Sequence, residues 1–234
     1  MNPRSVLRTV GSRPRATRLP WRTSWRSAGF LVIDVETTGL DVRRDEVISF
    51  AGVPVERGRI LVGGVVSGLV GPSAPPSASS IRIHGLRAQD LAGAPTGYGA
   101  LAPLAVALSG RIPVAHAAWI EQGFLGPGLR AAGAALPSRF VDTALLWRLL
   151  CVLRGEADPG VRSLVGIATT LGLPMHRPHE ADGDALTTAQ VFLALATHLE
   201  RHGRGRVRAL AGAASYLDAW QLTRPPATFD ISAR

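Results

Sequence analysis

One stretch near the N-terminus, FLVIDVETTGL at residues 30–40, constrains the fold more than any other part of the sequence. Its apolar residues are typical of a buried strand, yet the run also carries two acids, Asp34 and Glu36. Because side chains alternate with a period of two along a strand, both carboxylates point to the same face of the predicted sheet. Two neighbouring like charges repel each other. The stretch therefore indicates either a divalent cation between the acids or a strand end where water solvates both.

The rest of the chain predicts a mixed α/β sheet flanked by helices in one domain. Two further strands are expected at residues 46–56 and 58–70, and the short connection at Arg57-Gly58 indicates an antiparallel hairpin. A Pro/Ser-rich loop follows at residues 71–80. Downstream we expect short strands at 111–117 and just before Asp142. Helices are expected at 98–109, 162–172, 180–200 and 206–220. One further helix is expected after residue 117, interrupted at Gly126-Pro127-Gly128, and another is expected to begin at Asp142.

The basic charge of the chain is concentrated at its N-terminus. The sequence has 26 basic residues, all arginine, and 17 acidic residues, for a formal net charge of +9. Residues 1–28 hold seven of these arginines and no acid, so we expect a disordered arm at 1–28. A folded domain is expected at 29–203, and a C-terminal helix and tail at 204–234. The arm could contact phosphates, act as a transit peptide or be dispensable.

The cysteine count and the hydropathy limit the cellular setting. Cys151 is the only cysteine, which excludes an intramolecular disulfide framework and a cysteine-built zinc site. No apolar run reaches the roughly 18 residues that a membrane span needs, so we expect no membrane association. These features favour a reducing, cytoplasmic location.

Further acids fall at the predicted ends of elements, next to histidines. Glu121 lies one turn into a helix that follows a strand, and Asp184 lies early in a long helix. His179 precedes Asp184 by five residues, about 500° of α-helix, so the two cannot share a helical face. We therefore place His179 on the loop or cap before the helix, as Pro178 also indicates. From there it could reach a water molecule on a metal ion held by Asp184.

Four segments occur in a fixed order between residues 29 and 200. They are D-V-E-T-T-G-L at 34–40, I-H-G-L at 83–86, D-T-A at 142–144, and H-E-A-D-G-D-A at 179–185. Together they resemble the DEDDh 3′–5′ exonuclease superfamily, which contains the proofreading epsilon subunit of bacterial DNA polymerase III. The first and last segments together form a specific signal of this superfamily.

This resemblance implies a ribonuclease H-like fold and a phosphodiester hydrolase that uses two divalent cations, Mg²⁺ or Mn²⁺. The implied catalytic residues are the metal-holding acids and a general base: Asp34, Glu36, Glu121 and Asp184 for the metals, and His179 for the proton. The implied contacts to the 3′-terminal nucleotide are the backbone of one turn and a bordering side chain: Thr37, Thr38, Gly39 and His84.

The second motif of the superfamily departs from its usual form. The pattern H-N-A-x-F-D-x-x-F-L is represented by HAAWIEQGFL at residues 116–125. Glu121 thus stands where aspartate is usual, and Ala117 stands where asparagine is usual. The carboxylate is kept and is one methylene longer. We expect activity to survive with an altered metal preference, and loss of catalysis is the alternative.

Three functions remain open at this point. The first is a 3′–5′ exonuclease on DNA ends, of the proofreading or repair type, and the second is an RNA-trimming or oligoribonuclease-like enzyme. The third is a catalytically weak module that binds nucleic acid or a polymerase. The implied partners are single-stranded or 3′-end nucleic acid and a DNA polymerase. Contact with a sliding clamp through the tail at Gln221-Leu222 is not expected, because the match ends after two positions.

Two tryptophans and one acid have structural interpretations. Trp119 and Trp147 lie at helical positions and are predicted to be core residues rather than platforms for base stacking. Asp142 is predicted to be a helix N-cap rather than a metal ligand.

Overall fold

The apolar run of the first motif forms the central strand of the sheet. In the computed structural model, which describes residues 20–222, β1 (Gly29–Thr37) pairs antiparallel with β2 (Val47–Glu56) and parallel with β5 (Ile112–Ala115). The remaining strands are β3 (Arg59–Ile60) and β4 (Val66–Leu69), which both pair with β2, and β6 (Val141–Asp142), which is parallel to β5. The strand order is β3-β2-β1-β5-β6. This mixed sheet confirms the predicted fold class.

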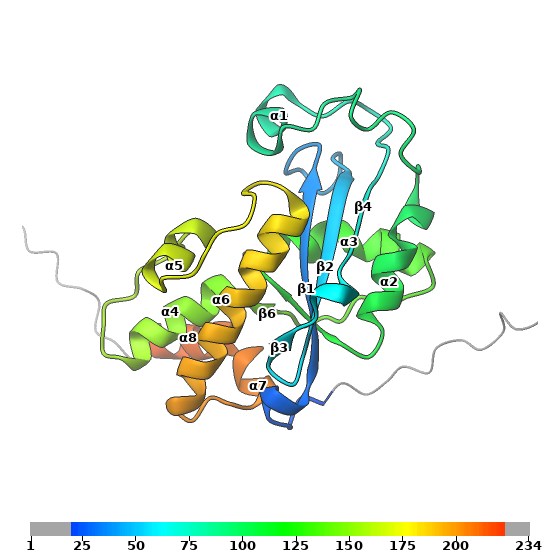
Figure 1. Cartoon of the computed structure of the whole chain (residues 1–234). Coiled ribbons are helices and arrows are strands. Elements are labelled where there is room, and N and C mark those ends of the chain that lie inside the picture. Colours follow the sequence, from blue (N-terminus) through cyan, green and yellow to red (C-terminus); the bar gives the residue numbers. More distant parts are fainter. Residues whose placement is uncertain (1–19, 223–234) are drawn as a thin grey trace, which may run out of the picture.

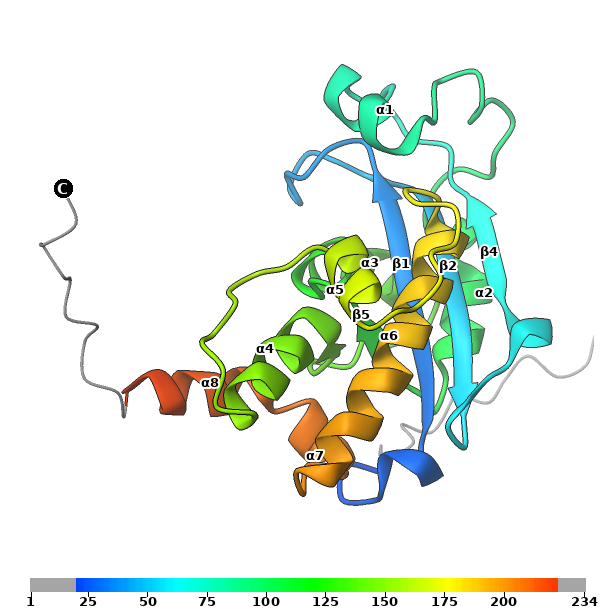
Figure 2. The ribbon, with the colours of Figure 1, turned by 60° about the vertical axis from the view of Figure 1, so that its left-hand side comes forward.

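Helices cover both faces of the sheet (Figures 1 and 2). The long α6 (Ala181–Arg201) packs on one face, and α2 (Ala102–Leu108) and α3 (Trp119–Ala131) pack on the other. The other helices are α1 (Ala78–His84), α4 (Thr143–Leu153), α5 (Leu164–Thr170), α7 (Val207–Leu210) and α8 (Ala213–Leu222).

The side chains of β1 divide between two hydrophobic cores. Phe30 and Val32 are buried in the core that contains α6, whereas Leu31 and Ile33 are buried in the core that contains α2 and α3. This alternation follows from the period of two along a strand. Residues 34 and 36 therefore continue the face that looks toward α6.

Three predicted elements differ in detail from the structure. Residues 58–70 form two short strands rather than one, because a 3₁₀ turn at Val62–Gly64 separates β3 from β4. Pro127 does not interrupt its helix, since Phe124 and Leu129 on either side of it are buried and hold α3 together. The C-terminal helix predicted at 206–220 is divided into α7 and α8.

The folded part of the chain begins before the predicted boundary at residue 29. Trp25 is only 1% exposed, and its ring lies 6.1 Å from that of Phe192 on α6. Its backbone N–H donates to the carbonyl of Gly205 at 3.0 Å, so the segment before β1 is joined to the chain after α6. Arg26 forms an ion pair with Glu200 at 2.8 Å and is part of this packing rather than of an arm.

Residues 1–19 of the predicted arm and residues 223–234 of the tail, which follow Gln221-Leu222, lie outside the described residues. Within residues 20–222, no helix combines the length and the hydropathy that crossing a bilayer requires.

Candidate active site

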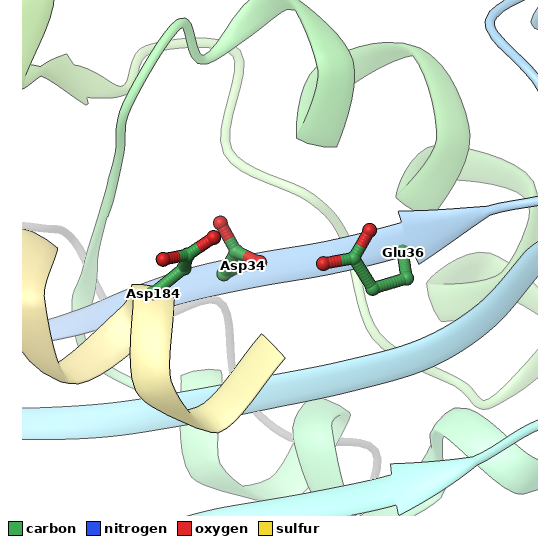
Figure 3. A group of neighbouring side chains, drawn as sticks. All are labelled: Asp34, Glu36 and Asp184. Carbon is green, nitrogen blue, oxygen red and sulfur yellow. The ribbon is translucent and has the colours of Figure 1, made fainter. Parts of the chain in front are cut away.

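Two elements bring three carboxylates together beside the C-terminal half of β1 (Figure 3). Asp34 and Glu36 come from β1, and Asp184 comes from the first turn of α6. One carboxylate oxygen of each residue lies within 4.8 Å of those of the other two. Oxygen ligands at this spacing suit hard divalent cations such as Mg²⁺ and Mn²⁺.

Burial disfavours the charged forms of these carboxylates. It raises the pKa of Asp34 well above its usual value, and the charges of Glu121, Glu36 and Asp184 raise that pKa further. Burial and the charge of Asp184 raise the pKa of Glu36 to about 8. Burial also raises the pKa of Asp184 itself. A bound cation would offset this repulsion, so the donor set fits the divalent metal ions that the motifs imply.

Glu121 lies near this group of three but outside it. It occupies the first turn of α3, is 2% exposed, and has one carboxylate oxygen, Oε2, without a hydrogen-bond partner among residues 20–222. Burial raises its pKa to about 8, and the charges of Asp142 and Glu36 contribute to the shift. An unpartnered buried oxygen of this kind is suited to a water molecule or a further cation.

His179 lies on the loop directly before α6, at the place that the sequence predicts. Its φ is 63°, and its backbone N–H donates to Asp184 Oδ2 at 3.0 Å. Gly183 lets this loop approach the helix, because a Cβ there would collide with the carbonyl oxygens of His176 and Arg177. The backbone of the loop is thus fixed against the helix that carries Asp184.

The turn after β1 is held by an acid that the sequence analysis did not identify. The hydroxyl of Thr38 donates to Asp45 Oδ1 at 2.9 Å, and the carbonyl of Thr38 accepts from Ser80 Oγ at 2.6 Å. Gly39 is needed here because a Cβ would collide with the Asp45 carboxylate. Asp45 and Ser80 thereby fix the Thr37–Gly39 turn to the next loop and to α1. No local sequence pattern distinguishes Asp45 from other loop acids.

His84 is the last residue of α1 and is largely buried beside the carboxylates. Its Nδ1 accepts from the backbone N–H of Leu86 at 3.0 Å. Burial lowers its pKa, and the charge of His179 acts in the same direction. His84, His179 and Glu36 line one groove of about 610 Å³, together with Ser67 of β4. We call this the α1 groove.

The RNase_T family model, described as an exonuclease, matches residues 31–192. The match covers more than half of the chain and runs from β1 into α6, so it includes Asp34, Glu36, Glu121 and Asp184. The chain belongs to the exonuclease family.

Several curated relatives of this exonuclease-family chain are associated by name with DNA replication or nuclease activity. A DNA polymerase III subunit epsilon-like protein of Rhodobacter capsulatus is 33% identical over 74% of the chain. A DNA polymerase III PolC-type of Thermotoga petrophila is 31% identical over 81% of it, and the 3′-5′ exonuclease DinG of Bacillus subtilis is 30% identical over 74%. The chain spans only 24%, 13% and 18% of the lengths of these three proteins, respectively.

Solved structures support the fold. Exonuclease X, in complex with 5′ overhanging duplex DNA, matches with a TM-score of 0.60 and 23% identity, covering 79% of this chain and 98% of that one. Exonuclease I of E. coli, in complex with a dT13 oligonucleotide, matches with a TM-score of 0.63 and 15% identity, covering 75% and 42%. The predicted ribonuclease H-like exonuclease fold is therefore confirmed.

Asp142 serves two helices of the exonuclease domain. Its Oδ1 accepts from the backbone N–H of Ala144 at 2.9 Å, which confirms the predicted N-cap of α4. Its carboxylate also accepts from the N–H groups of Ala117 and Ala118, at 3.2 and 3.0 Å, directly before α3. The sequence did not predict this second role, because Ala118 and Ala117 lie 24 and 25 residues away from Asp142 along the chain. Asp142 thereby fixes the start of the helix that carries Glu121.

Ala117, at the second departure from the usual family motif, has strained backbone. Its φ is 57°, a left-handed conformation that asparagine tolerates better than alanine. We expect Ala117→Asn to raise the free energy of unfolding by about 0.5–1 kcal/mol. Urea titration checks this, with Ala132→Asn as the control, since residue 132 has a φ of −78° and gains nothing from asparagine. An equal or lower stability of Ala117→Asn would contradict the strain argument.

Proposed function

We propose that this chain is a 3′–5′ exonuclease that removes nucleotides from the 3′ ends of nucleic acid, with DNA as its main substrate. The observation that carries the proposal is the convergence of Asp34, Glu36 and Asp184 in a half-buried, mutually repelling group. A group of this kind serves no packing purpose and suits divalent cations. The names of the polymerase III relatives support DNA over RNA.

The carboxylates would hold two divalent cations, Mg²⁺ or Mn²⁺. Asp34, Glu36 and Asp184 are the proposed direct ligands, and Glu121 would act at the outer side, directly or through water. When bound, the cations would activate a water molecule and offset the charge that develops on the phosphate.

The proton of the attacking water would go to the imidazole of His179. This side chain shares the α1 groove with Glu36, and its backbone bond to Asp184 keeps it at a fixed place beside the ligands. The backbone of Thr37, Thr38 and Gly39 would contact the terminal nucleotide, and His84 would border the same pocket. The bonds from Asp45 and Ser80 keep this turn rigid.

A DNA polymerase is the proposed protein partner, on the basis of the names of the epsilon-like and PolC-type relatives. Single-stranded DNA or a 3′ end in an overhang is the proposed nucleic-acid partner. A cytoplasmic location remains a prediction from the cysteine count.

The test uses 5′-labelled oligonucleotides of DNA and RNA, both single-stranded and 3′-recessed, with Mg²⁺, Mn²⁺ or EDTA. We expect a ladder that shortens from the 3′ end, requires metal and forms faster on DNA. Faster cleavage of RNA than of DNA would make RNA, rather than DNA, the main substrate. No ladder on any substrate would favour a module that binds nucleic acid without cleaving it.

Glu121 provides the sharpest test of the altered second motif. We expect Glu121→Gln to lower the cleavage rate about 100-fold, because a supporting carboxylate at a metal site is lost. Glu121→Asp keeps the charge and should stay within about tenfold of the wild type. Single-turnover rates in Mg²⁺ and Mn²⁺ check both. An inactive wild type that Glu121→Asp activates would mean that the longer side chain prevents catalysis.

A further inference from the structure

Trp119 is exposed at a place where the sequence predicts a core residue. Its exposed fraction is 55%, whereas Trp147, for which the same prediction was made, is 6% exposed and is confirmed as a core residue. Trp119 is the first residue of α3 and lies two residues before Glu121. A large aromatic side chain that is half in solvent, on the helix that also carries Glu121, points to an interaction surface.

Trp119 lines a second groove, of about 560 Å³, which we call the α3 groove. Gln122, one helical turn later and therefore on the same face of α3, lines it as well. Val161 and Arg139 come from two other segments of the chain, and Val161 is 82% exposed. The groove thus combines an aromatic face, an aliphatic contact, an amide and a guanidinium group.

Arg139 is the cation lining the α3 groove that has no direct partner among the described residues. Arg148, which also lines the groove, contacts both carboxylate oxygens of Asp158, at 2.9 and 2.6 Å. Asp142 is saturated by the backbone N–H groups before α3 and at the start of α4. Within residues 20–222, Arg139 forms no hydrogen bond or ion pair. The guanidinium group of Arg139 is therefore available for contact with a phosphate.

The α1 and α3 grooves lie on opposite sides of β1 along the sheet. The α1 groove is lined by Ser49 of β2 and Ser67 of β4, whereas the α3 groove is lined by Ala117 and Asp142, at the ends of β5 and β6. The strand order places β1, with its two acids, between them. A strand whose terminal nucleotide occupies the α1 groove could continue past the carboxylates into the α3 groove.

We infer that the α3 groove binds the nucleotides that precede the scissile one in a single strand, with Trp119 stacking on a base and Arg139 contacting a phosphate. This inference rests on the proposed function and adds a binding subsite to it. Aromatic faces bind bases with little regard to sequence, and arginine binds the backbone phosphates. The pairing of an exposed indole with an unpaired guanidinium suits a nucleic-acid strand better than an apolar protein surface.

Binding is measured first, in EDTA, where no cleavage occurs. The oligonucleotide dT8 should quench tryptophan emission of the wild type, and Trp119→Phe should lose this quenching whereas Trp147→Phe keeps it. Trp119→Ala should raise the Kd for dT8 about tenfold. Arg139→Gln should reduce the slope of log Kd against log salt by about one unit. The matched controls are Val106→Ala, on an exposed face of α2, and Arg59→Gln, on β3.

Substrate length provides the second readout. A dinucleotide reaches less far into the α3 groove than dT8, so Trp119→Ala should raise KM for dT8 about tenfold and for dT2 by less than threefold. Equal Kd values for Trp119→Ala and Val106→Ala would overturn the inference, and so would an equal loss on dT2 and dT8.

The two proposals fail in distinguishable ways. A wild type that binds dT8 through Trp119 but forms no ladder in any metal would refute the exonuclease and leave the α3 groove standing. If the wild type is active but its binding of dT8 depends on neither Trp119 nor Arg139, the inference about the α3 groove alone is refuted. The groove would then belong to another occupant, such as a protein surface.

Discussion

Asp34→Asn is expected to lower the cleavage rate about a thousandfold, because several kcal/mol of metal-dependent stabilisation of the transition state depend on this carboxylate. The same change should raise the melting temperature of the metal-free protein by about 2 °C. Asp34 is the acid whose pKa is raised by the charges of Glu121, Glu36 and Asp184 together, so its replacement by a neutral isostere removes repulsion from all three. Activity and metal-free stability therefore move in opposite directions.

Single-turnover cleavage in Mn²⁺ and thermal unfolding in EDTA measure the two effects. The control is Glu56→Gln, at the far end of β2, where a partly exposed ion pair with Arg111 contributes little to stability. Retention of more than a tenth of the wild-type rate by Asp34→Asn would exclude this residue as a ligand. A lower melting temperature in EDTA would refute the claim that the carboxylates repel one another in the absence of metal.

His179→Asn is expected to lower kcat by about 100- to 10,000-fold, the usual contribution of a general base. Asparagine is the replacement of choice because it tolerates the φ of 63° that residue 179 adopts. The bond from residue 179 to Asp184 comes from the backbone, so the variant keeps it. Metal binding should therefore survive the loss of the imidazole.

The rise in melting temperature on adding Mn²⁺ shows whether the His179 side chain serves metal binding or proton transfer. We expect His179→Asn to keep the wild-type rise while losing turnover, and His176→Asn, three residues earlier in the same loop, to keep both. His176 is a suitable control because its imidazole is engaged elsewhere: its Nε2 lies 2.9 Å from the side-chain nitrogen of Gln190. If His179→Asn also lost the rise, the side chain would belong to the metal site rather than to proton transfer.

The sequence was sufficient to predict the central strand and the direction of its acids, because a period of two is a local property. It also located His179 before α6, since five residues of helix cannot bring it onto the face of Asp184. Pro127 was misjudged for the opposite reason. The tendency of proline to interrupt a helix is overridden by the packing of α3 against the sheet. The residues next to Pro127 in the sequence do not reveal that packing.

The supporting contacts of the site were beyond sequence reasoning. Asp45 acts on Thr38 through a loop conformation, and Ser80 acts on Thr38 across 42 residues of chain. The difference between Trp119 and Trp147 is similar, because both follow helical spacing and only the three-dimensional arrangement decides which one is covered.

The shared cap at Asp142 has a consequence for how this domain can change in evolution. One carboxylate caps the starts of two helices, so a substitution at residue 142 would disturb the start of α3, where Glu121 lies, as well as the start of α4. Changes at 117, 121 and 142 are therefore expected to occur together in a lineage. An unusual residue at any one of these positions should be interpreted with the other two in view.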